Sequence, residues 1–129
     1  MSADQKGKFS FPELDRTLHE RARLGILSCL ASSQSALTFA DLRDLCDLTD
    51  GNLSRHLHAL EQAGIVELRR GTRGTRPLTL VLFTTDGRRR FLDYVDALEE
   101  IVRDSAAAMR GRRKEPRDRR ALPEGWVPA

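Results

Sequence analysis

The sequence predicts an α+β domain, mostly α, with a three-helix core, a two-stranded hairpin and a long last helix. Apolar residues recur at three- and four-residue steps up to about residue 60, alternate with polar residues from about 65 to 84, and then return to helical spacing. The chain has 129 residues, 40% of them hydrophobic, which suits one domain with a single core. That size argues against a two-domain enzyme, and two cysteines cannot build a disulfide scaffold.

The first two helices are expected at residues 12–31 and from Thr38 to about Cys46. Pro12 suits an early helical position, and helical spacing is kept by Leu14, Leu18, Ala22, Leu27 and Leu30. After a polar break at 32–36, Thr38 with Asp41 three residues later has the pattern of a capping box. The buried stripe of the second helix is expected to be Phe39, Leu42 and Leu45.

A third helix, a hairpin and a last helix are expected in the rest of the domain. A tight turn is expected at 47–49, and Thr49 or Asp50 can cap the start of the third helix. This helix is expected to end at Gly64, in a left-handed conformation. Its buried residues are Leu53, Leu57 and Leu60. Alternation predicts strands at 65–70 and 78–84 with a turn at 71–76. The last helix starts near Thr84 and Asp86 and runs to about Met109.

These elements give three expected regions: an N-terminal extension at 1–11, the domain at 12–110, and a basic tail at 111–129. The tail is expected to be disordered because it has no apolar period. The net charge of +3 conceals two basic blocks of net +5, at 65–90 and at 103–120. Of the 22 basic residues 19 are arginine, whose planar fork suits phosphate oxygens and base edges. A solvated surface is the simpler interpretation of an isolated charge run, so the position of these arginines in the fold decides whether they have a function.

The outer face of the third helix has the chemistry of a DNA-reading surface. If its leucines face the core, then Gly51, Arg55 and His58 lie on the opposite side, flanked by Asn52 and Ser54. Such a slim polar helix fits a major groove about 12 Å wide and can hydrogen-bond to base edges. Taken alone, the same pattern describes an ordinary amphipathic helix.

The arginines of the hairpin favour the DNA interpretation. Arg69, Arg70, Arg73 and Arg76 cluster around a glycine-bearing turn and repel one another. This arrangement is tolerable at a solvated tip and becomes favourable against a polyanion. Arg73 and Arg76 are the candidates for phosphate or minor-groove contacts.

Three segments resemble winged helix-turn-helix transcriptional regulators of the MarR/ArsR type, closest to the small single-domain branch. They are LTDGNLSRHL at 48–57 continuing through LEQAGIV at 60–66, RLGIL at 23–27, and FTTDG at 83–87. The resemblance covers roughly residues 13–105. It implies a homodimer that binds a pseudo-palindromic operator in double-stranded DNA and controls transcription, with a repressor favoured over an activator. The resulting DNA-binding candidates are Thr38, Gly51, Asn52, Ser54, Arg55, His58, Arg73 and Arg76. The alternative is a winged-helix protein-interaction module that does not use DNA.

The last helix is expected to form the dimer interface because its apolar face is broader than a small core can cover. The interface candidates are Phe91, Tyr94, Val95, Leu98, Ile101 and Val102. Pairing there would set two recognition helices about 34 Å apart, one turn of B-DNA. The alternative is that this helix folds back onto the first helix of its own chain.

Other functions find little support. No apolar run approaches the roughly 20 residues of a membrane span, and the polar start of the chain suggests a cytoplasmic protein. Cys29 and Cys46 are interpreted as packing residues, with a redox switch as a weaker hypothesis. Metal-sensing members of the resembled family carry Cys-x-Cys where this chain has Thr38 and Ala40, so no metal is expected. We expect no enzyme activity and no cofactor, while the resemblance allows for an unidentified small-molecule effector.

Overall fold

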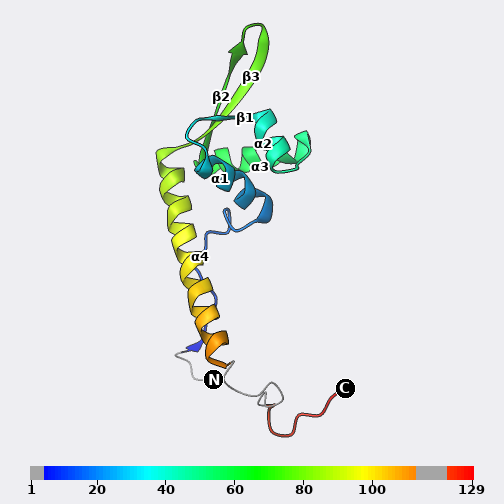
Figure 1. The fold of residues 1–129 in the computed structure, drawn as a ribbon, viewed down its shortest axis with the longest axis vertical. Coiled ribbons are helices and arrows are strands. Elements are labelled where there is room, and N and C mark those ends of the chain that lie inside the picture. Colours follow the sequence, from blue (N-terminus) through cyan, green and yellow to red (C-terminus); the bar gives the residue numbers. More distant parts are fainter. Residues whose placement is uncertain (1–4, 113–121) are drawn as a thin grey trace. The chain divides into compact units, whose positions relative to one another are not determined.

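The computed structural model describes residues 5–112 and 122–129 and confirms the predicted fold class (Figure 1). The elements are α1 (Arg21–Ser32), β1 (Leu37–Thr38), α2 (Phe39–Leu45), α3 (Asp50–Gln62), β2 (Val66–Arg73), β3 (Arg76–Phe83) and α4 (Thr85–Arg112). The chain divides into two units, one up to Ala97 and one from Leu98 onward that includes the end of α4. The middle of the predicted tail, 113–121, lies outside the described residues.

The predicted start of the first helix was wrong by nine residues. α1 begins at Arg21 because the Glu20 carboxylate caps it, accepting hydrogen bonds from the backbone N–H groups of Ala22 and Arg23. The segment before it forms turns, although Leu18 is still fully buried. The helical spacing of apolar residues before Arg21 therefore does not indicate a helix, because a turn buries Leu18 there.

Asp15 ties the segment before α1 to α4. Its carboxylate accepts a hydrogen bond from Arg90 Nη2 at 2.7 Å, and Arg90 Nη1 donates to the carbonyl of Ala63 at 2.8 Å. Burial, the largest influence, raises the pKa of Asp15, but hydrogen bonds from Arg90 and the Thr17 N–H together with the charge of Arg90 outweigh it, so the net pKa is lowered. The ionised Asp15 is thus part of the folded state.

The helix-turn-helix follows the prediction closely. Thr38 and Asp41 form a reciprocal capping box at α2, and the Thr49 hydroxyl accepts from the Asn52 N–H at α3. The leucines of α3 are fully or almost fully buried, but in α2 only Leu42 is buried and Leu45 is 66% exposed. The expected apolar stripe of α2 is therefore narrower than predicted, with Leu42 as its one buried residue.

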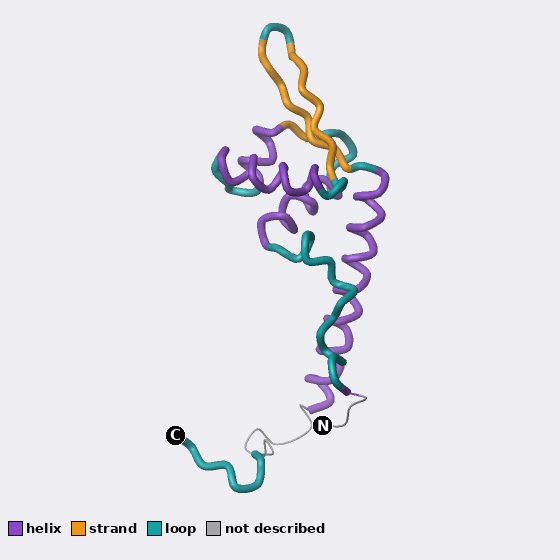
Figure 2. Tube along the Cα trace, turned by 180° about the vertical axis from the view of Figure 1, so that it is seen from behind, coloured by secondary structure: helices purple, strands orange, loops and turns teal. Residues whose placement is uncertain are grey.

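The sheet has the order β1-β3-β2 and is antiparallel throughout (Figure 2). β1 was not predicted, because two residues are too few for alternation to be visible. The hairpin is longer than predicted: Arg73 pairs directly with Arg76, so the loop consists of Gly74 and Thr75 alone. Gly74 has φ +63°, and this left-handed residue makes the two-residue loop possible.

The junction between the hairpin and α4 is closely packed. The Thr84 hydroxyl accepts from the Gly87 N–H at 2.8 Å and donates to the carbonyl of Gly64 at 2.6 Å. Gly87 lies directly against the backbone of Ile65, and a Cβ built there would be 1.9 Å from the Ile65 oxygen. Only glycine fits at this position without movement of the backbone.

Candidate nucleic-acid interface

The α3 helix presents the polar face that the sequence predicted. Its buried side carries Leu53, Leu57 and Leu60, whereas the residues predicted to read DNA are all exposed. These exposed residues are Gly51, Asn52, Ser54, Arg55 and His58. The structure therefore places all five on one accessible surface of a thirteen-residue helix.

Two polar contacts organise the first turns of this face. Arg55 Nη2 donates to Asn52 Oδ1 at 3.2 Å, so the two side chains lie side by side one turn apart. Arg43 of α2 donates to Asp50 Oδ1 at 3.1 Å and to Asp44 Oδ1 at 3.0 Å. Hydrogen bonds to Asp44 and then Asp50 raise the pKa of Arg43, and this side chain links α2 to the start of α3.

The predicted candidate Thr38 lies apart from α3, at the start of α2. Its side-chain oxygen accepts from the Asp41 N–H at 3.0 Å, so its first role is to cap the helix. Its hydroxyl hydrogen is still available as a donor, and Thr38 is half-buried.

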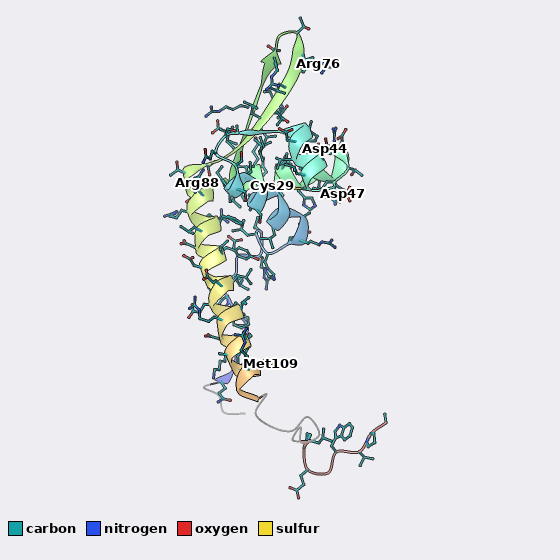
Figure 3. The ribbon with its side chains drawn as sticks, in the orientation of Figure 1. Cys29, Asp44, Asp47, Arg76, Arg88 and Met109 are labelled. Carbon is teal, nitrogen blue, oxygen red and sulfur yellow. The ribbon has the colours of Figure 1, made fainter. Side chains whose placement is uncertain are left out.

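The hairpin carries arginines along its whole length. Arg69 donates to Glu67 at 2.7 Å, but Arg70, Arg73 and Arg76 form no ion pair with any residue of the described ranges. Arg73 and Arg76 stand directly opposite each other beside the loop, and Figure 3 shows Arg76 on the outer part of the hairpin. Like charges in this position destabilise a hairpin unless an anion lies between or beside them.

Successive side chains along β2 point to opposite faces of the sheet, so the arginines of this strand are divided between two faces. Arg70 lies on the same face as the buried Val66 and the half-buried Leu68, whereas Arg69 and Arg73 lie on the other face. The face that carries Arg70 meets α3 at an open groove of about 510 Å³. Its walls include Ser54, His58 and Glu61 from α3 and Arg70 and Thr79 from the hairpin.

Arg70 was therefore under-ranked by the sequence analysis, which preferred the two arginines nearest the turn. The signal was present, because Leu68 and Arg70 are two residues apart on a strand and must share a face. The sequence alone did not show that α3 lies along that same face.

The residues expected at a dimer interface divide into two sets. Phe91 and Tyr94 are 7% and 1% exposed and belong to the core of their own chain, where Phe91 packs against Phe83 at 5.8 Å between ring centroids. The Tyr94 hydroxyl lies 2.6 Å from His19 Nδ1, and burial raises the pKa of Tyr94. Val95, Leu98 and Ile101 are half-buried, and Val102 is 59% exposed. The prediction thus needs correction for the two aromatic residues, which have almost no surface left for a partner.

Comparison with known families decides the assignment. The profile described as "Winged helix DNA-binding domain" matches residues 22–102, more than half of the chain. The chain belongs to this winged-helix DNA-binding domain family. The match runs from α1 into α4 and includes all of α3 and the hairpin that forms the wing.

Relatives of this winged-helix chain are found among archaeal and bacterial proteins. An uncharacterized protein of Methanocaldococcus jannaschii is 39% identical over 66 residues, which are 51% of this chain and 72% of that protein. The transcriptional regulator homologue from Pyrococcus horikoshii OT3 has a TM-score of 0.63 at 24% identity and covers 78% of this chain and 96% of its own. The M. tuberculosis regulator MosR, solved in complex with DNA, has a TM-score of 0.59 at 19% identity over 87% and 83%. A further structural neighbour is described as a regulator of the MarR family. At these identities the neighbours show that the fold is shared.

No helix in the described ranges is long and apolar enough to cross a membrane. Within the same ranges, no three His, Cys, Asp or Glu side chains come together as a metal site.

Proposed function

We propose that this protein is a transcriptional regulator that binds double-stranded DNA as a homodimer, with α3 in the major groove and the arginine-bearing wing on the backbone or in the minor groove. In its more specific form, the proposal is a repressor on a pseudo-palindromic operator. The observation that carries it is the α3–wing groove, in which polar side chains of the helix and Arg70 of the wing line one open surface.

The wing supplies the electrostatic part of the proposal. Arg70 faces the groove beside α3, so it suits a phosphate at the edge of the major groove into which α3 inserts. Arg73 and Arg76 at the tip suit the next phosphates or the adjacent minor groove. Each phosphate neutralised releases condensed counterions, which favours binding, and the phosphates screen the mutual repulsion of the tip arginines.

The helix face supplies the specific part. Arg55 can pair with guanine O6 and N7, and Asn52 beside it can pair with adenine N6 and N7. Gly51 has nothing within 4 Å of its ideal Cβ position, so the start of α3 is open to close approach by DNA.

The dimer is proposed to form along α4. Val95, Val102 and Met109 recur every seven residues, and Leu98 lies three residues after the first of them. A seven-residue apolar repeat on a 28-residue helix is typical of a helix that packs against another helix. Val102 and Met109 are exposed, so this stripe offers apolar surface to a second copy.

DNA binding is tested by selection from a random 30-base-pair library, about three turns of duplex, followed by anisotropy titration at several salt concentrations. Affinity for the enriched duplex should fall steeply with salt, and Arg73→Ala should reduce the magnitude of the log–log slope by about one unit. The control Arg16→Ala removes the same charge from the exposed segment before α1 and should leave the slope unchanged. A flat salt response, or no enrichment, would favour the protein-interaction module.

The dimer is tested by light scattering on the full chain. Val102→Asp places a charge in the proposed apolar stripe and should shift the protein to monomer. Asp104→Lys changes the charge on a different face of α4 and should leave the dimer intact. A wild-type mass equal to one chain at all concentrations would refute the proposed dimer.

A further inference from the structure

Cys29 and Cys46 are 17 residues apart in sequence and meet in the fold. Cys29 lies on α1 and Cys46 is the C-cap residue of α2, with their Sγ atoms 3.7 Å apart. Both thiols are free and half-buried. They are the two cysteines of the whole chain, so no third thiol competes for the pairing.

The α1 surface leaves room for the Cys46 sulfur. Gly25 precedes Cys29 by one helical turn on the same face, and an ideal Cβ at Gly25 would lie 4.0 Å from Cys46 Sγ. A larger side chain at position 25 would occupy the space beside this sulfur. The contact between α1 and the end of α2 is thus built around two thiols and a glycine.

We infer that Cys29 and Cys46 form a reversible disulfide within one chain, and that this bond weakens DNA binding by displacing the turn between α2 and α3. The second part rests on the function proposed above. Bond formation requires the sulfur atoms to approach from 3.7 Å to about 2.05 Å. We expect side-chain rotation to supply part of this change and a shift of the Cys46 backbone to supply the rest.

The displacement acts on a constrained turn. Directly after Cys46, Asp47 has φ +52°, a left-handed conformation unusual for a residue with a side chain. The Asp47 and Leu48 N–H groups donate to the carbonyls of Asp44 and Arg43, at 3.3 and 3.0 Å. Figure 3 shows Cys29 among the helices and Asp47 at this turn. A pull on Cys46 is therefore transmitted to the residues that set the direction of α3.

The oxidation has a defined order. Burial, followed by the interaction with Cys29, raises the pKa of Cys46 to about 11, so Cys46 is protonated at neutral pH and is a poor first nucleophile. The Cys29 thiol attacks a hydroperoxide and becomes a sulfenic acid, while the hydroperoxide is reduced to the alcohol, or to water if it is hydrogen peroxide. Cys46 then displaces water from this sulfenic acid and forms the S–S bond, and a dithiol reductant restores both thiols.

The test treats the full-length reduced protein with hydrogen peroxide and measures free thiols, intact mass and affinity for the selected duplex. The expected result is loss of both thiols, an intact mass lower by about 2 Da, and binding weakened roughly tenfold, with the oxidised chain still a monomer on a non-reducing gel. Dithiothreitol should reverse the first three changes. Cys29→Ser and Cys46→Ala should keep the affinity of the reduced protein and lose the response to peroxide.

Backbone amide shifts provide a readout that does not depend on DNA. Oxidation should shift the amides of residues 46–50 and leave those of the wing tip, 73–76, unchanged. Two thiols that stay free, a disulfide between chains, or an oxidised protein with unaltered shifts and affinity would each overturn the inference. If the reduced protein enriches no duplex, the proposed function fails, while the thiol count and amide shifts still decide the disulfide and the movement of the turn.

Discussion

Gly87 gives the sharpest test of the packing at the junction between the wing and α4. In Gly87→Ala, the new Cβ would lie 1.9 Å from the Ile65 oxygen and 2.6 Å from its carbonyl carbon. Both neighbours are backbone atoms, so no side-chain rotation relieves the clash. The backbone must separate by at least about 1.5 Å to reach an ordinary contact.

The cost follows from what that separation breaks. The Ile65 carbonyl accepts hydrogen bonds from the Thr84 N–H at 3.0 Å and from the Thr84 hydroxyl at 3.2 Å. Loss of two such bonds costs roughly 1–3 kcal/mol, overpacking adds about 1–3 kcal/mol, and the helix propensity of alanine returns up to about 1 kcal/mol. We expect the free energy of unfolding to fall by about 1–5 kcal/mol, and the melting temperature by about 4 °C for each kcal/mol lost.

The assay is urea unfolding followed by circular dichroism at the helix band. Gly51→Ala is the matched control, because it makes the same substitution on an exposed helix with no atom within 4 Å of the ideal Cβ. This control should be stabilising by roughly 0.5–1 kcal/mol. If the two variants unfold at the same urea concentration, the contact between Gly87 and Ile65 is not as close as described here.

Two further predictions concern an ion pair and base reading. Asp15→Asn should lower stability at pH 7 by roughly 1–2 kcal/mol, because the hydrogen bond from Arg90 loses its charged acceptor. Since the folded-state pKa of Asp15 is lowered, its contribution is present above the unfolded value near 3.8 and disappears as pH falls through the folded-state pKa. In urea titrations from pH 7 to pH 2, the free energies of unfolding of variant and wild type should therefore converge. A difference in stability that stays constant with pH would contradict the pairing. Glu13→Gln, at an exposed position, is the control. Arg55→Ala should cost about 1–3 kcal/mol on the selected duplex and relax its sequence preference, whereas equal losses on all duplexes in the same anisotropy assay would argue against base contact.

Features with strong local causes were predictable from the sequence. The caps at Thr38 and Thr49, the leucine spacing of α3 and the left-handed Gly64 at φ +75° all depend on residues within one or two helical turns. The polar face of α3 follows directly from that spacing. The proposed DNA-reading surface was therefore visible before the fold.

Features created by distant contacts were not predictable. The segment before α1 is held by Asp15 reaching Arg90, 75 residues away, and the two-residue β1 exists only because it pairs with β3. Arg70 became a candidate once α3 was seen beside the wing, and the two cysteines became a pair only when α1 met α2. Each case needs the tertiary structure, since neither partner carries a local signal.

The uninterrupted pairing of β2 and β3 limits how this wing can change in length. Since Arg70 faces the groove and Arg69 faces away, inserting or deleting a single residue before them would exchange the two arginines between faces. Addition of two residues to each strand would preserve every direction and extend the hairpin by about 7 Å, close to the rise of two base pairs along a duplex. Lengthening of the wing before Arg69 therefore keeps these side-chain directions only in even steps of each strand.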